Sequence, residues 1–362
     1  MAVLLGHFAN LLEFPVFLQQ LISGGIGVSF FFVLSGFILC YRYWDTFAEG
    51  VAAGSYRRYF VARVARVYPS YALALVLMTA LLLGLDAYRP KTLDFPPNVF
   101  GSWLATALCV HTFAPTQLTQ QFWNAPGWSI STEFGFYLVC PLLLALAARF
   151  CRTGPRLALA LAFNVAFAVL AQAATLYAVI RWGWDRGFWL DTVASRNIFW
   201  RLPEFVTGIV AARLLYGGHL KWLANPLNRN VLLATSLALI IAINLAPWPA
   251  TDRGMMIVRQ FRLENAYMLP FAVVITSLAA GATFLSPLLR QRWFMFLGDA
   301  SYGVYIFHWF PWTALTLAKA AGYLVRIDVV WIVVFITIMF ASASYIGFER
   351  PARLYLRGRF GQ

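Results

Sequence analysis

Charged residues are scarce in this sequence, and their scarcity excludes most classes of protein. Aspartate, glutamate, lysine and arginine make up 12% of the 362 residues, whereas hydrophobic residues make up 61%. A soluble globule of this size needs more polar side chains to cover its surface, so an ordinary soluble domain is excluded. The mean hydropathy of +0.70 indicates an integral membrane protein.

Cysteine is also sparse, and its spacing points to no cross-link or metal. The four cysteines, Cys40, Cys109, Cys140 and Cys151, include no CxxC pair and lie mostly in apolar surroundings. This spacing predicts neither a disulfide framework nor a cysteine-based zinc site. We expect cysteines that pack in the protein interior and no metal cofactor.

Acidic residues are half as numerous as basic ones, 14 against 28, which gives a formal net charge of +14. A basic balance of this size can indicate nucleic-acid binding. Here the basic residues form short clusters between apolar segments, where determinants of membrane topology and contacts with anionic lipids belong. We therefore expect membrane lipids as partners and no nucleic acid.

Apolar segments of about 20 residues, enough to cross a hydrocarbon core of about 30 Å, recur along the chain. No polar stretch is long enough for a separate soluble domain, so we predict one membrane domain over residues 1–362. The predicted fold class is all-α, a polytopic helical bundle. Its apolar segments are 1–18, 26–44, 66–86, 99–114, 128–149, 157–180, 197–216, 229–248, 264–287, 294–318 and 328–348.

The segment 99–114 is short and is interrupted by His111, with Pro115 after it. Loops rich in lysine and arginine prefer the cytoplasmic side, and the chain obeys this rule better if 99–114 does not cross. We therefore predict about ten transmembrane helices, one re-entrant or interfacial segment, and two cytoplasmic termini. The basic residues assigned to the outer side include Arg89, Lys91, Arg186, Arg253, Arg259 and Arg262.

The first apolar segment begins at Met1 without a polar or basic flank that would anchor a helix at the membrane surface. A signal peptide is an alternative, but the segment lacks a basic n-region and a small-residue cleavage site. We expect residues 1–18 to be the remaining part of a first helix that is truncated at its N-terminus.

A few titratable residues fall inside apolar segments, where a charge costs about 2.5 to 3.5 kcal/mol on insertion scales. His7 is one of them. A neutral imidazole can accept a proton from an alcohol, because imidazole titrates near neutral pH. The alternative for His7 taken alone is a histidine hydrogen-bonded to a neighbouring helix.

Arg63 and Arg66 lie three residues apart in RRYFVARVARVYP (Arg57 to Pro69) and share one helix face at the cytoplasmic surface. Two guanidinium groups suit a polyphosphate, because each presents a planar fork of donors, and a coenzyme A thioester carries such phosphates. Binding of anionic lipid headgroups explains the pair equally well.

The strongest local pattern is NAPGWSISTEFGFYLVCP (Asn124 to Pro141), an apolar segment that opens on Ser129, Ser131, Thr132 and Glu133. A carboxylate near a helix N-terminus can serve as a simple cap, since free backbone N–H groups favour it there. However, these polar side chains are crowded beside Trp128 and Tyr137. This crowding favours a different interpretation, in which the segment forms the wall of a polar cavity that binds an alcohol acceptor.

Two further segments carry polar residues at helical spacing. In FWRLPEFVTG (Phe199 to Gly208), Arg201 and Glu204 lie three apart and are expected to form a structural ion pair. In FLGDASYGVYIFHW (Phe296 to Trp309), Ser301, Tyr305 and His308 form a polar stripe on one helix. The stripe either lines a pathway or locks helices together.

These segments, in this order, resemble the acyltransferase family 3 of integral membrane O-acyltransferases. The resemblance covers nearly the whole chain and rests on the His7 region, GVSFFFVLSGF, the Arg63 and Arg66 run, WSISTEFGFYLVCP, RLPEFVTG, LGDASYGVYIFH and GFERP. Members transfer acetyl or related groups from cytoplasmic acyl-CoA to hydroxyl groups. The family usually has an arginine upstream of the first-helix histidine, and counting back from His7 places it before Met1.

The resemblance implies acetyl-CoA or another acyl-CoA as co-substrate, and a glycan, lipid-linked sugar or exported small molecule as acceptor. We predict that Arg63 and Arg66 hold the coenzyme A phosphates, while His7 acts as general base or carries the acyl group. Glu133 would orient His7 as a carboxylate orients the imidazole in hydrolase triads. Candidates for the acceptor side are Ser131, Trp128, Tyr302 and His308.

Two other functions are open on the sequence. Buried charges and interrupted helices also mark secondary transporters, although the two halves of this chain show no inverted repeat. The other alternative is an inactive, lipid-binding relative of the acyltransferases.

Overall fold

A computed structural model of the chain describes residues 1–22, 24–88, 93–114, 116–183, 185, 189–246 and 265–360. Within these ranges every regular element is a helix and no strand occurs, which confirms the predicted all-α class. Some basic residues used for the predicted topology, namely Arg89, Lys91, Arg186, Arg253, Arg259 and Arg262, lie outside the described residues.

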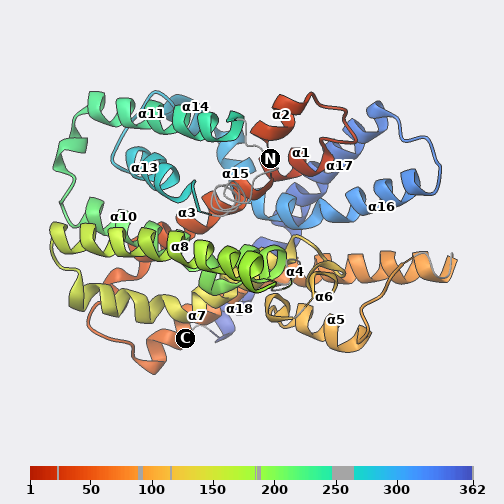
Figure 1. Ribbon diagram of the computed structural model, residues 1–362, viewed down its shortest axis with the longest axis horizontal. Helices are drawn as coiled ribbons and strands as arrows, with labels where there is room; N and C mark the ends of the chain where they lie inside the picture. The colour runs from red at the N-terminus through yellow and green to blue at the C-terminus, as the bar shows by residue number, and fades with distance from the viewer. Residues whose placement is uncertain are drawn as a thin grey trace. The chain divides into compact units, whose positions relative to one another are not determined.

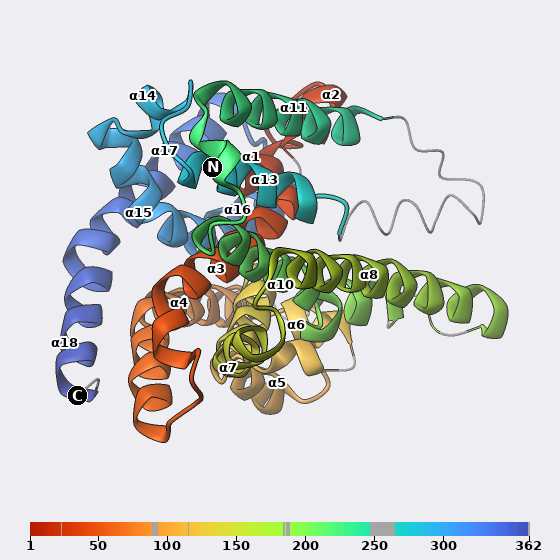
Figure 2. The same ribbon diagram turned by 90° about the vertical axis from the view of Figure 1, so that its left-hand side faces the viewer.

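Six helical stretches of the described chain are long and apolar enough to cross a membrane, so the chain is an integral membrane protein. Four of them are single helices: α4 (Ala53–Tyr88), α7 (Gly127–Phe150), α8 (Gly154–Trp182) and α11 (Pro226–Leu245). The others are Phe17–Phe47, which includes α3 (Gly24–Phe47), and Ile327–Phe360, which joins α17 (Ile327–Ser344), η4 (Tyr345–Glu349) and α18 (Arg350–Phe360). Figure 2 shows α18 leading to the C-terminus.

The prediction of one continuous helix over residues 1–18 is wrong. The segment contains α1 (Ala2–Phe8) and the start of α2 (Val16–Leu21), with a turn between them. Glu13 in this turn has a φ of 53°, in the left-handed region that interrupts a helix, and Pro15 precedes α2.

The predicted segment 294–318 is also not one helix. It is divided at His308 into α15 (Arg292–Phe307) and α16 (Trp309–Ala320). Pro311 has no N–H and therefore cannot donate to the carbonyl of Phe307 four residues earlier, which breaks the regular helical ladder at this point. The described part of the segment 264–287 likewise contains a shorter helix, α13 (Met268–Ala279), and the start of α14 (Ser286–Leu289).

The segment 99–114 contains α5 (Val99–Ala107) and the short η1 (His111–Phe113), and α6 (Gln117–Gln121) follows it. Nine residues of α5 rise about 14 Å, less than half of a hydrocarbon core. That the segment does not cross the membrane stays a prediction.

The chain divides into two compact units. The first comprises Met1–Gly24, Arg57–Phe134 and Arg292–Gln362. In it, α15 packs against α1, α16 and α17, and α5 packs against α6 (Figure 1). This unit holds most of the residues that the sequence nominates for chemistry.

The second unit comprises Gly25–Tyr56 and Gly135–Gln291. Here α10 (Ile198–Tyr216) packs against α8 and α13, and α13 packs against α11 (Figure 2). A side chain at Gly36 of α3 would overlap the carbonyl of Phe205, so α3 and α10 meet in direct backbone contact. Small residues allow such close approach between membrane helices.

Candidate active site

The imidazole of His7, on α1, lies against the junction of α15 and α16. Its Nδ1 is 3.0 Å from Nε2 of His308, and the two rings stack with their centroids 5.0 Å apart. His308 is fully buried and His7 is half-buried. The sequence nominated both histidines but assigned them separate roles, and the structure brings them into contact.

Two tryptophans of α16 hold His7 in place. The indole N–H of Trp312 donates to the backbone carbonyl of His7 over 2.8 Å. The ring of Trp309 meets the His7 imidazole edge-on, with centroids 5.3 Å apart, and stacks on Trp312 at 4.2 Å. Neither residue was predicted from the sequence, although Trp312 lies four positions after His308 and so continues the polar stripe by one helical turn.

His308 is anchored on the side opposite His7. Its Nδ1 lies 2.6 Å from the backbone carbonyl oxygen of Tyr305. The Tyr305 hydroxyl donates to the carbonyl of Pro126 over 2.9 Å and lies 2.7 Å from the hydroxyl of Ser129. Tyr305 and His308 therefore link α15 to the start of α7 and to α1, whereas the Ser301 hydroxyl donates to Gly298 of its own helix.

Glu133 lies four residues after Ser129 on α7, and only 2% of its surface is exposed. Residues four apart share a helix face, so Glu133 is on the face by which Ser129 reaches Tyr305. In the structure, the His7 ring has a hydrogen-bond partner in His308. Orientation of His7 by Glu133 stays a prediction.

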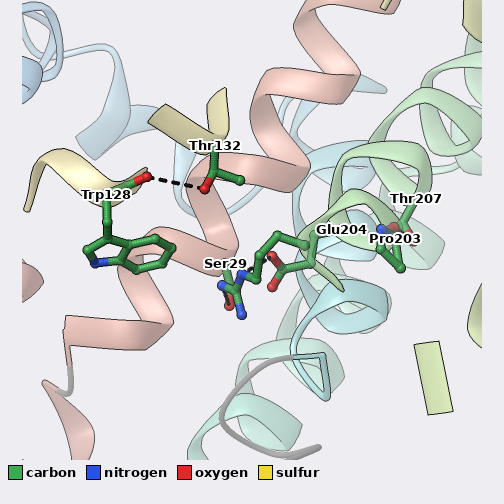
Figure 3. A network of polar contacts seen from close by, with 7 residues as sticks. Ser29, Trp128, Thr132, Pro203, Glu204 and Thr207 are labelled. Atoms are coloured by element: carbon green, nitrogen blue, oxygen red, sulfur yellow. Dashed lines mark hydrogen bonds and ion pairs between the residues drawn. The ribbon is translucent and has the colours of Figure 1, made fainter. Parts of the chain in front are cut away.

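Ser131 and Trp128, both nominated for the acceptor side, make local contacts. The Ser131 hydroxyl donates to the carbonyl of Cys109 over 2.7 Å and lies 2.8 Å from the hydroxyl of Thr112. Cys109 has a φ of 56°, which residues other than glycine rarely adopt, so Ser131 holds a strained turn. The carbonyl of Trp128 accepts a hydrogen bond of 3.1 Å from the Thr132 hydroxyl (Figure 3).

Tyr302 connects α15 to α4. Its hydroxyl donates to the backbone carbonyl of Val67 over 2.8 Å. Val67 directly follows Arg66, which is exposed, and lies about one helical turn after Arg63, which is half-buried. The helix that ends at His308 is thus tied to the stretch of α4 that carries the two nominated arginines.

A charged cluster surrounds Glu349, a residue of the terminal GFERP motif that the sequence analysis gave no role. Glu349 is 4% exposed, and its Oε2 accepts a hydrogen bond of 3.1 Å from the Ser70 hydroxyl of α4. The charges of Arg66 and Arg353 interact favourably with this carboxylate. Within the described residues, no group of three or more histidines, cysteines and acidic residues is arranged to hold a metal ion.

Arg201 and Glu204 form a buried ion pair in the second unit. Nε of Arg201 lies 3.1 Å from Oε2 of Glu204, with the two side chains 2% and 0% exposed. The Arg201 guanidinium also donates to Ser29 over 3.3 Å and lies over the ring of Phe32, so it links α10 to α3. Figure 3 shows Ser29 beside Glu204.

Comparison with known proteins gives a family match over nearly the whole chain. Residues 1–348 match a family model described as an acyltransferase domain. Acyltransferase MdmB of Streptomyces mycarofaciens is 28% identical over 294 residues, which are 79% of this chain and 67% of that protein. No solved structure matches the chain.

Two further relatives match most of this chain. Nodulation protein 10 of Rhizobium leguminosarum bv. viciae is 26% identical over 357 residues, 92% of this chain and 83% of that protein. The putative peptidoglycan O-acetyltransferase YrhL of Bacillus subtilis (strain 168) is 24% identical over 341 residues, 91% of this chain and 51% of that protein.

Proposed function

This chain belongs to the acyltransferase 3 family of membrane acyltransferases. We therefore propose that it transfers a short acyl group from acyl-CoA to a hydroxyl group, and we favour acetyl as that group. The acceptor is a cell-envelope polysaccharide, a lipid-linked sugar or an exported small molecule. The name of the relative YrhL, a putative peptidoglycan O-acetyltransferase, supports acetyl and an envelope glycan as the first pair to test.

The contact between His7 and His308 is the observation that carries this proposal. Transfer from a thioester to an alcohol requires a base that removes the hydroxyl proton as the new C–O bond forms. His7 takes this proton, the acceptor oxygen bonds to the thioester carbonyl carbon, and the C–S bond breaks. The proton then passes from His7 to the departing thiolate, which leaves as coenzyme A.

We assign the coenzyme A phosphates to Arg63 and Arg66. The side chains lie on one face of α4, and the Tyr302 hydroxyl ties α15 to the same stretch of that helix. A donor held there is therefore connected through α15 to His308. Glu349 offsets part of the Arg66 charge, while the exposure of Arg66 leaves the guanidinium accessible to a phosphate.

The start of α7 supplies the remaining roles. Glu133 balances the positive charge of His7 after proton transfer, a role supported by its burial and by its place on the Ser129 face. Trp128, Ser131 and Tyr302 line the acceptor side, whereas His308, which contacts Nδ1 of His7, supports the base. The Arg201–Glu204 pair is structural, because each charge neutralises the other within the helix bundle.

We further propose about ten crossings in the bacterial inner membrane, with both termini in the cytoplasm. The six long apolar stretches support several crossings, and α10 adds a helix of 19 residues. The location of Arg63 and Arg66 on the cytoplasmic side would give them access to cytoplasmic acyl-CoA.

The proposal is tested with the purified full-length protein in lipid nanodiscs. Acetyl-CoA is supplied with a panel of envelope glycans and small alcohols, and release of the free thiol is measured. An enzyme consumes the thioester only when an acceptor is present. A transporter or an inactive lipid-binding relative leaves acetyl-CoA intact with every acceptor, and that result would reject the proposal.

A second measurement identifies the acceptor in cells. Mass spectrometry of envelope glycans is compared between cells that carry the protein and cells that lack it. We expect acetyl groups on a glycan hydroxyl only in the first sample. Identical acetylation in both samples would exclude an envelope glycan as the acceptor.

A further inference from the structure

We propose that His308 is a positioning residue that fixes the tautomer of His7, so that Nε2 of His7 is the atom that takes the acceptor proton. This inference rests on the proposed acyl transfer and deepens it, because it names the reactive atom and the group that orients it. The orienting group is a second imidazole fixed by a backbone carbonyl.

The assignment starts at Tyr305, because its carbonyl oxygen can only accept a hydrogen bond. Nδ1 of His308, 2.6 Å from this oxygen, must therefore carry a hydrogen. The neutral form of an imidazole carries one ring hydrogen, so Nε2 of His308 presents a lone pair. The reverse tautomer would set a lone pair on Nδ1 against the lone pairs of the carbonyl.

The same reasoning then fixes His7. Nε2 of His308 accepts, so Nδ1 of His7, 3.0 Å away, must donate. Neutral His7 then carries its lone pair on Nε2, on the side of the ring that faces away from His308. The carbonyl of Val3, one turn earlier in α1, is a second acceptor for a hydrogen of the His7 ring.

The supporting contacts make this chain of hydrogen bonds rigid. The hydroxyl of Tyr305 is fixed by Pro126 and Ser129, and the backbone of His7 is fixed by Trp312. When His7 accepts a proton, Nδ1–H still points at the lone pair of His308, and that contact stabilises the cation. A neutral orienting group also suits a membrane protein, because it adds no second buried charge.

Two variants of His308 separate hydrogen bonding from packing. In His308→Gln, the side-chain carbonyl can accept from Nδ1 of His7, whereas His308→Leu fills space without an acceptor. Since a base in the wrong tautomer loses most of its contribution, we expect His308→Leu to lower kcat about a hundredfold or more, with KM for acetyl-CoA nearly unchanged. His308→Gln should keep kcat within about tenfold of the native protein.

The matched control is His219→Leu, which changes an exposed histidine and should leave kcat unchanged. Elution volume and thermal melting of each variant in detergent establish that it is folded. Equal losses of kcat in His308→Leu and His308→Gln, or no loss in either, would overturn the inference.

Nitrogen NMR tests the tautomer without any turnover. The chain has four histidines, so ¹⁵N-histidine labelling of the native protein gives a simple spectrum that single substitutions assign. We expect the hydrogen on Nδ1 in both His7 and His308. A hydrogen on Nε2 of His7 would overturn the inference even if acyl transfer is observed, whereas absence of transfer with the expected tautomer would reject only the proposed function.

Discussion

The indole N–H of Trp312 donates a hydrogen bond of 2.8 Å to the backbone carbonyl of His7. This bond joins α16 to α1, two elements that are separated by most of the chain. It fixes the backbone of His7 while the ring contacts His308, so it controls where the imidazole lies without touching the reacting atoms. We therefore propose that Trp312 is a positioning residue for His7.

Replacement of Trp312 by Phe removes this hydrogen bond and keeps an aromatic ring. We expect kcat to fall about tenfold, because a displaced His7 meets the acceptor hydroxyl less often in the productive geometry. Stability should fall by about 1 kcal/mol, the usual net value of one hydrogen bond. Trp222→Phe is the control, since Trp222 is 50% exposed, and an equal loss of kcat in that variant would refute the assignment.

Replacement of His7 by Ala should abolish acyl transfer and leave expression and folding intact. A positioned general base contributes about a hundredfold to ten-thousandfold, so the rate of thiol release should fall by about that factor. Acceptor-dependent release of coenzyme A is the measurement. The exposed His219→Ala variant is assayed in parallel, and product acetylation by His7→Ala at the native rate would remove His7 from the mechanism.

Several features of the fold could be predicted from hydropathy alone. The apolar runs gave α7, α8 and α11 nearly at their observed limits, because a membrane-spanning helix needs a long uninterrupted apolar stretch. The start of α4 was missed, because the helix begins at Ala53, well before the apolar run 66–86. The breaks inside the segments 1–18 and 294–318 were not predicted. Pro15 and Pro311 were visible in the sequence, but averaging hydropathy over a window ignores the lost backbone donor that ends a helix.

The candidate site was predicted only residue by residue. His7 and His308 each stood out as a titratable group in an apolar segment, yet 301 positions separate them and no local spacing relates them. Their contact depends on how α1 packs against α15, which is a property of the tertiary structure. The anchoring of Ser131 to Cys109 was hidden for the same reason, because the left-handed turn at Cys109 has no sequence signature.

Replacement of Arg66 by Gln should weaken acetyl-CoA binding. Loss of one guanidinium–phosphate contact should raise KM about tenfold with little change in kcat, since the contact is made equally in the ground state and the transition state. The initial rate is measured as a function of acetyl-CoA concentration. The exposed Arg290→Gln variant controls for net charge, and an equal rise of KM in both variants would contradict a specific contact.

Stability should depend strongly on Glu204, whose carboxylate lies 3.1 Å from Arg201 and is fully buried. Glu204→Gln leaves the Arg201 guanidinium without its counter-charge, at a cost of about 3 to 5 kcal/mol. The double variant Arg201→Met with Glu204→Leu removes both charges and should be more stable than Glu204→Gln, because no unpaired charge is left in the interior. Thermal unfolding in detergent ranks the stability of the native protein, Glu204→Gln and the double variant.

The control for this pair is Asp328→Asn. Asp328 accepts two hydrogen bonds from Arg326, but both side chains are more than half exposed, so its loss should leave the unfolding temperature nearly unchanged. The same chemical change, acid to amide, thus has a large effect in the interior and a small one at the surface. If the double variant unfolds at a lower temperature than Glu204→Gln, the residues contribute more than charge neutralisation, and a purely structural role for the pair is wrong.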